Sequence, residues 1–260
     1  MRALRLTPLL MCLIGALGAV PAKADIDSAT EKGQASFAAE NHAEAEQAST
    51  WLPKPFKTRY RVRYEGVPFS ATGTRELKQA SSGQFHFESH ISAFLIRMDE
   101  EAQFGFDEDG LRAASYAERR SGIAGNRDRT VDFDWSVPKV VRRGDKESEL
   151  EIEGQVYDPV SWQIALQRDL SLSPYEQGDV FTYAVSNGGE PDVYRLEITE
   201  IGEISVPAGS FRTILLERDH TPDNDRETRI WLAPEHDHLL VRLEHIDDRK
   251  LTLTLEEIIE

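Results

Sequence analysis

Two groups of histidines have the residue types that could bind a metal ion. His86, Glu88 and His90 alternate along one predicted strand and therefore share a face of it. Side chains two residues apart on a strand are about 7 Å apart and those four apart about 13 Å, whereas zinc ligands lie about 2 Å from the metal. One ion cannot bind all three, and a neighbouring pair would need ligands from another strand. His236 and His238 are expected in a surface turn, so no metal or other cofactor is predicted.

Two acidic turns and one serine are the remaining candidates for metal binding or catalysis. Asp107-Glu108-Asp109-Gly110 and Asp223-Asn224-Asp225 resemble the first positions of a calcium loop. Neither continues into the twelve-residue pattern that ends in a bidentate glutamate, so we expect plain turns. Ser161 has no nucleophile elbow around it and no specific histidine or acid partner. The sequence therefore favours a protein that is not an enzyme, without deciding the question.

Three arginines, Arg59, Arg61 and Arg63, occupy one face of a predicted strand. If that face points outward, it is a solvated strand face, which is the simpler interpretation. If it lines a concavity, it would favour an anionic ligand, because the fields of several like charges add. The choice depends on how the strands curl.

The elements that carry these residues are predicted to be antiparallel strands. From residue 56 to 64 aromatic and apolar side chains share one face and basic side chains the other, which is typical of a strand with one buried face. Turn residues such as Asn187-Gly188-Gly189 separate the later segments. The pattern predicts strands over residues 56–64, 69–77, 85–91, 98–106, 111–119, 127–135, 148–153, 179–186, 192–201, 211–219, 226–232, 239–246 and 249–257.

One helix interrupts the strands. Asp158-Pro159 is a helix start, because aspartate caps free amides and proline fits the first turn. The segment 160–170 places apolar side chains around most of the helix circumference, which predicts a buried helix near 158–170. We therefore expect an all-β, mainly antiparallel domain, in which a large curled sheet or incomplete barrel wraps around one buried helix.

A crevice between that sheet and its helix is the predicted ligand site. The strands outnumber what a flat sheet holds comfortably, and one helix cannot fill a wide curl. We predict that Tyr60, Phe85, Phe87 and Phe104 line this crevice and bind an apolar or amphiphilic ligand, since burying apolar surface gains roughly 25 cal/mol per Å². In the alternative, these aromatic side chains fill the interior completely and leave no room for a ligand.

The first 24 residues indicate the compartment. Arg2 and Arg5 precede an apolar stretch from Leu9 to Val20, and Ala22-Lys23-Ala24 resembles a cleavage site, which is the pattern of a signal peptide. The apolar stretch is too short for a permanent membrane span, and no other segment approaches its length, so we expect the mature protein in the periplasm. The predicted division is a signal peptide over 1–24, a flexible acidic and alanine-rich linker over 25–50 and a single domain over 51–260.

Composition excludes several classes of partner. The chain has a formal charge of −16, and removing the predicted signal, which carries three basic and no acidic residues, takes it to −19. Nucleic-acid binding is excluded, because it needs lysine and arginine to neutralise phosphates. Adsorption to anionic membranes is disfavoured for the same reason. The only cysteine, Cys12, lies in the signal, so the core alone must hold the mature domain together.

Several spaced motifs make the chain similar to a known family. They are Pro55-Phe56 followed by Tyr60-x-Val62 and Gly66, Asp158-Pro159-x-Ser161, Pro207-x-Gly209-x-Phe211-x-Thr213, Trp231-Leu232-Ala233-Pro234 and Val241-Arg242-Leu243-Glu244. In this order, from about Trp51 to the C-terminus, they resemble the exported bacterial family known as domain of unknown function 3108. The chain departs from that family at Leu240, where proline is usual. The resemblance implies a periplasmic, mainly antiparallel β domain, and it supplies no catalytic residues.

Three hypotheses for the function follow. The first is a non-enzymatic periplasmic protein of cell-envelope maintenance that binds an apolar or amphiphilic ligand, by analogy with other exported carriers built from curled sheets. The second is a periplasmic scaffold whose sheet edges recruit an envelope protein by strand addition. The third, a hydrolase of envelope material, is the weakest, because no nucleophile, metal set or oxyanion motif can be named.

Overall fold

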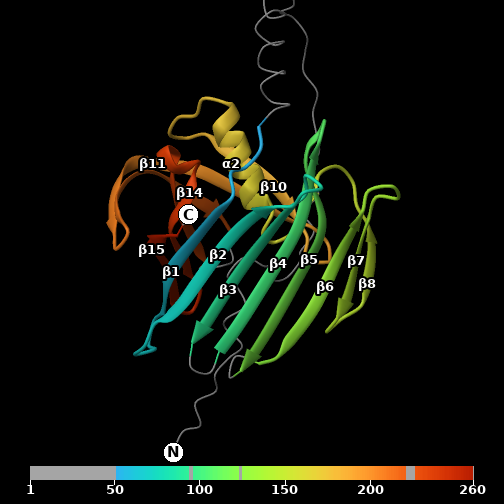
Figure 1. Ribbon diagram of the computed structural model, residues 1–260, viewed down its shortest axis with the longest axis horizontal. Coiled ribbons are helices and arrows are strands. Elements are labelled where there is room, and N and C mark those ends of the chain that lie inside the picture. Colours follow the sequence, from blue (N-terminus) through green and yellow to red (C-terminus); the bar gives the residue numbers. More distant parts are fainter. Residues whose placement is uncertain (1–50, 94–95, 123–124, 221–225, 260) are drawn as a thin grey trace, which may run out of the picture.

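The computed structural model describes residues 51–93, 96–122, 125–220 and 226–259. The predicted signal peptide, the predicted linker and the Asp223-Asn224-Asp225 turn lie outside these ranges. Within them the chain forms fifteen strands, the helix α2 (Trp162–Leu172) and the short 3-10 helix η1 (Pro234–His236) (Figure 1). The strands are β1 Phe56–Tyr64, β2 Ala71–Gln79, β3 Phe85–Ala93, β4 Ile96–Asp107, β5 Gly110–Gly122, β6 Arg127–Asp134, β7 Lys139–Gly144, β8 Ser148–Glu151, β9 Val156–Tyr157, β10 Val180–Val185, β11 Asp192–Val206, β12 Gly209–Asp219, β13 Glu227–Ala233, β14 Leu239–Ile246 and β15 Lys250–Ile258.

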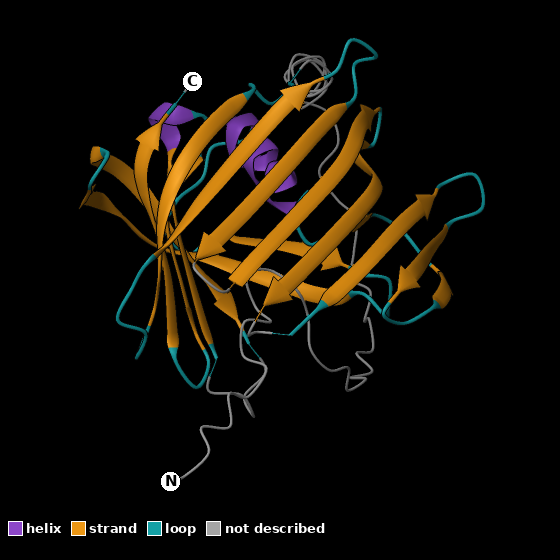
Figure 2. Ribbon diagram, turned by 60° about the horizontal axis from the view of Figure 1, so that its bottom comes forward, coloured by secondary structure: helices purple, strands orange, loops and turns teal. Residues whose placement is uncertain are grey.

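All of these strands join one sheet. The order runs from β8 back to β1, and then from β15 back to β9, so the first and last strands pair in the middle of the sheet. Neighbouring strands are antiparallel, except that β9 runs parallel to β10. The free edges are β8 and β9, so the sheet curls without closing into a barrel (Figures 1 and 2). The predicted curled antiparallel sheet is confirmed.

Most predicted strands differ from the structure by a few residues at their ends, and larger differences occur at β7, at β9 and in the hairpin of β11 and β12. β7 and β9 are not among the predicted strands, because β9 has only two residues and β7 places its two valines at adjacent positions, so neither shows an alternation. The hairpin of β11 and β12 extends beyond its predicted ends to a tight turn at Gly209, whose φ is 139°. Residues other than glycine rarely adopt this conformation.

The helix α2 lies on the concave side of the sheet, as predicted (Figure 2). It begins at Trp162 rather than at Asp158, because Asp158 caps a preceding turn. The Oδ1 atom of Asp158 accepts hydrogen bonds from the amides of Val160 and Ser161 at 2.8 and 2.9 Å. The Ser161 hydroxyl in turn accepts from the Asp158 amide at 3.3 Å, which gives this serine a structural role. The buried helical residues are Trp162, Ile164, Ala165, Leu166, Gln167 and Leu170.

Two apolar clusters fill the concave side, and a row of polar residues lies between them on the wall formed by β1 to β6. Phe87 and Ile91, two residues to either side of Ser89 on β3, belong to different clusters. None of the six members of the row is more than 9% exposed. Each member pairs directly with the next on the neighbouring strand, and we call them the polar row: Thr58, Arg75, Ser89, Glu100, Glu118 and Arg129.

Candidate functional site

The structure separates the four aromatic residues of the predicted crevice. Phe85, Phe87 and Phe104 lie in one apolar cluster, where the rings of Phe85 and Phe104 stack with centroids 5.6 Å apart. Tyr60 lies in the other cluster, across the polar row, and its hydroxyl donates to the carbonyl of Leu240 at 2.7 Å. None of the four is more than 1% exposed. Of the four, Phe87 borders an interior cavity.

This interior cavity has a volume of about 20 Å³ and lies where α2 meets the polar row. It has room for about one water molecule. Its wall includes Arg75 from the polar row, Phe56 and Phe87 from the sheet, and Gln163 and Gln167 from the helix. A charged side chain and two amides therefore face a space that is otherwise apolar.

Arg75 is the unusual residue of the interior cavity, because it places a charge in the core. Its Nη2 atom donates to Oε1 of Gln163, and its guanidinium carbon lies 4.9 Å from the centre of the Phe87 ring. Burial lowers the pKa of Arg75 from its ordinary value, while the Tyr60 hydroxyl and the more distant Glu100 raise it. Among the residues that the structure describes, no carboxylate forms a salt bridge with Arg75.

At the far end of the polar row, charged side chains compensate one another. Glu118 contacts Arg120 through Oε1 and Arg129 through Oε2, both at 2.5 Å. Tyr116 donates to Oε1 of Glu100 at 2.8 Å. Burial raises the pKa of Glu100 to about 7; the Tyr116 hydrogen bond and the two arginines oppose the rise, and Glu118 adds to it. We call the two acids and two arginines, Glu100, Glu118, Arg120 and Arg129, the charge cluster.

A larger hollow of about 420 Å³ opens at the rim of the sheet, where β1 and β14 begin and β15 ends. We call it the rim hollow. Two of its apolar side chains, Leu52 and Ile258, are 50% and 39% exposed. The Lys54 ammonium at its wall pairs with Asp237 at 2.8 Å. The side chains that line it are Trp51, Leu52, Pro53, Lys54, Pro55, Phe56, Gln167, His236, Asp237, Leu239 and Ile258.

The histidines of the two predicted motifs have separate surroundings. His86 and His90 lie on the outward face of β3, each beside a carboxylate. His238 is buried, so its turn is less exposed than expected, and its ring contacts the hydroxyls of Ser171 and Tyr175 at 3.2 Å. Burial lowers the pKa of His238. No group of three or more metal-ligating side chains occurs in the described part of the chain.

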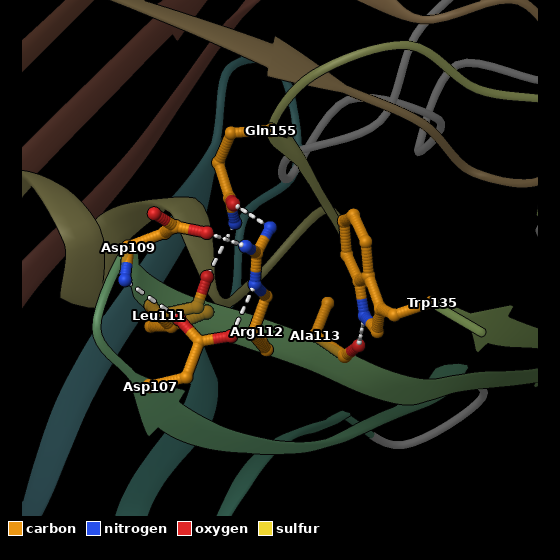
Figure 3. Close-up of polar contacts among 7 residues, drawn as sticks. All are labelled: Asp107, Asp109, Leu111, Arg112, Ala113, Trp135 and Gln155. Carbon is orange, nitrogen blue, oxygen red and sulfur yellow. Dashed lines mark hydrogen bonds and ion pairs between the residues drawn. The ribbon is translucent and has the colours of Figure 1, made fainter. Parts of the chain in front are cut away.

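The acidic turn between β4 and β5 connects its hairpin to a neighbouring loop through Arg112 (Figure 3). Asp107 and Asp109 both pair with Arg112, at 2.6 and 2.5 Å. Arg112 also donates to Oε1 of Gln155 at 2.6 Å, which ties the connection between β8 and β9 to this hairpin. The guanidinium lies 4.8 Å from the centre of the Trp135 ring. The carboxylates of this turn therefore serve a salt-bridge network, in line with the expected plain turn.

The arginines of β1 face outward. Arg59 and Arg61 form ion pairs with Glu257 and Glu256 of β15. Their side chains are 45% and 41% exposed, so they form the solvated strand face of the simpler interpretation.

Arg75 and the charge cluster are not among the predicted site residues. A signal for part of the cluster exists, because Met98, Glu100, Ala102 and Phe104 are alternate residues of β4 and all are buried. Glu100 is thus a charge within an apolar face. Arg75 has a weaker signal, since of the two alternate residues that flank it on β2, Gly73 and Leu77, only Leu77 has a large apolar side chain.

Together, the fold and the site define an open, curled antiparallel sheet with a helix on its concave side and a buried polar row. No helix in the described ranges is both long and apolar enough to cross a membrane. The model of the family described as protein of unknown function (DUF3108) matches residues 59–255, and the chain belongs to this family.

One solved structure and the curated proteins complete the comparison. The chain is similar to a β-barrel-like protein of domain of unknown function DUF1849 from Brucella abortus, with a TM-score of 0.54 and 8% sequence identity. The similarity covers 78% of this chain and 96% of that one. At this identity the likeness shows the fold alone. No curated protein matches the chain.

Proposed function

We propose that this chain is a non-enzymatic periplasmic protein of cell-envelope maintenance that binds an apolar or amphiphilic ligand in the rim hollow. The observation that supports it is the hollow itself, with about 420 Å³ of space and a mixed lining in which seven of the eleven residues are apolar. Ligand sites commonly have this size and lining. The signal pattern of residues 1–24 supports the compartment, in which amphiphiles must cross water.

The exposed apolar surface in the walls of the rim hollow contributes free energy to ligand binding. Leu52 and Ile258 expose apolar surface there, and covering such surface gains roughly 25 cal/mol per Å². In this proposal the buried aromatic residues Phe85, Phe87 and Phe104 pack the interior, and the ligand lies at its rim.

Strand addition at a sheet edge is the alternative function. The free edge strands have four residues in β8 and two in β9, so each offers a partner few ladder hydrogen bonds. Short edge strands are a usual means of avoiding edge-to-edge pairing. The rim hollow is therefore the better candidate.

Titration of the mature protein with N-phenylnaphthylamine, an uncharged fluorescent probe, tests ligand binding. We expect saturable binding that Leu52→Asp weakens by about tenfold or more, because the variant places a charge in the apolar wall. Val137→Asp is the matched control, since Val137 is 60% exposed in the turn between β6 and β7 and does not line the hollow. Absence of saturable binding, or equal weakening by both variants, would overturn the proposal.

The compartment has its own test. The intact mass of protein recovered from the periplasm should correspond to a chain that begins at Asp25. Recovery of an uncleaved chain, or recovery from the cytoplasm alone, would show that the export proposal is wrong.

A further inference from the structure

The interior cavity and the rim hollow meet at two side chains, Phe56 and Gln167, which line both spaces. Phe56 is the first residue of β1 and is half-buried. Gln167 donates from Nε2 to the carbonyl of His238 at 3.1 Å. These two side chains are thus the boundary between the space beside Arg75 and the space that is open to solvent.

Arg75 is the charge of the polar row for which the described residues supply no salt-bridge partner. Ser89 lies between Arg75 and Glu100 in the register of the sheet, so the backbones of these two residues are two strands, or about 10 Å, apart, and Glu100 acts on Arg75 only as a more distant charge. Glu100 also belongs to the charge cluster, where two acids already face two arginines. Arginine does not give up its proton in proteins, and a buried charge is costly until an opposite charge pairs with it.

The interior cavity also offers a hydrogen-bond donor that has no acceptor. Oε1 of Gln163 accepts from Arg75, whereas Nε2 of the same side chain is buried without a partner among the described residues. Arg75 and Gln163 both line the cavity. A guanidinium beside an amide N–H matches a carboxylate, because charge-assisted hydrogen bonds to carboxylates are strong. A water molecule could accept these hydrogen bonds but would leave the charge uncompensated.

We propose that the ligand of the rim hollow is an anionic amphiphile with a single alkyl chain, a fatty-acid-like monocarboxylate, whose carboxylate pairs with Arg75 in the interior cavity. This inference rests on the proposed function and adds the head group to it. The alkyl chain lies against the apolar walls of the hollow, and the side chains of Phe56 and Gln167 move aside to admit the carboxylate. Lys54 is already paired with Asp237 at the wall of the hollow, which leaves Arg75 to bind the head group.

Displacement of N-phenylnaphthylamine by dodecanoic acid and by dodecanol tests the head group. In the original protein we expect the acid to compete at a concentration at least about tenfold lower than the alcohol, because the carboxylate brings a charge opposite to that of Arg75, whereas a hydroxyl offers only a neutral acceptor. Arg75→Met should remove this preference, so that the acid and the alcohol compete at similar concentrations. Arg63→Met, which removes an exposed arginine of β1, is the matched control and should keep the preference.

The outcomes separate this inference from the proposed function. Equal competition by acid and alcohol in the original protein, or an unchanged acid preference in Arg75→Met, would overturn the head-group assignment and leave the rim hollow as a binding site. Failure of the probe and both competitors to bind would overturn the proposed function instead. The comparison in the original protein needs no variant, so the test holds even if Arg75→Met does not fold.

Discussion

Two sets of buried charges lie on the same polar row and differ in how they are compensated. In the charge cluster, Glu118 binds two arginines and Glu100 accepts a hydrogen bond from Tyr116. Arg75, three strands from Glu118, contacts the neutral Gln163 and an aromatic ring beside a cavity. Both sets are buried on the same wall, so burial alone does not distinguish them. A compensated cluster can be explained by the architecture, whereas a buried charge without a salt-bridge partner beside a cavity is the feature on which the proposed head-group site rests.

The largest effect on stability is expected in the charge cluster. Glu118→Ala leaves Arg120 and Arg129 buried without their shared carboxylate, and should lower the free energy of unfolding by about 3–5 kcal/mol. The matched control is Glu101→Ala, which breaks the half-exposed pair with Arg119 on the outer face and should cost about 0–1 kcal/mol. Urea denaturation measures both. Equal effects of the two substitutions would show that the cluster is not a structural centre.

Glu100 should make stability depend on pH. Its pKa is about 7 in the folded protein, because burial disfavours the carboxylate, against an ordinary value of 4.5. The stabilisation of the folded protein that comes from this raised pKa is therefore fully present below about pH 4.5 and is lost as the pH rises to about 7. Over this range the free energy of unfolding falls by about 3 kcal/mol, since each unit of pKa difference corresponds to about 1.4 kcal/mol.

Glu100→Gln removes this contribution while keeping an acceptor for Tyr116. The stability of the variant relative to the original protein should therefore rise between about pH 4.5 and 7, as measured by urea denaturation across that range. Asp158, whose pKa burial raises to about 6, titrates in both proteins and cancels in the difference. If the stabilities of the variant and the original protein changed in parallel with pH, the raised pKa would not belong to Glu100.

The smallest effect on stability is expected at Arg75. Arg75→Met removes an uncompensated charge from an apolar site and leaves no buried partner charge behind, so we expect a change within about 1 kcal/mol in either direction. The same urea experiment measures it. A loss as large as that of Glu118→Ala would mean that Arg75 is a structural charge, and the contrast between the two ends of the row would disappear.

Much of the fold could be predicted because the alternation of apolar and polar side chains can be recognised within each short segment of the sequence. The aromatic and basic residues of β1 alternate across its two faces, which reveals one buried face from the sequence alone. The buried helix was predictable for the same reason, since its apolar side chains surround it. β9 was not predictable, because two residues carry no period.

The candidate site was less accessible to sequence analysis, because it depends on register between strands. Alternation places Tyr60 and Phe87 on the concave face, but it does not show that the polar row divides them. That division follows from the pairing of Thr58 with Arg75 and of Arg75 with Ser89. The rim hollow combines residues 51–56 with His236, Asp237 and Leu239, which are distant in the sequence.

The measurement that tests the central claim most directly is a pH titration of protein-bound dodecanoic acid labelled with carbon-13 at its carboxyl group, followed by NMR. If the carboxylate pairs with Arg75, the pKa of the bound carboxyl should lie about 1 to 3 units below that of the free acid, because an adjacent positive charge favours ionisation. In Arg75→Met this lowering should disappear. A bound carboxyl that titrates at or above its free value in the original protein would contradict the account.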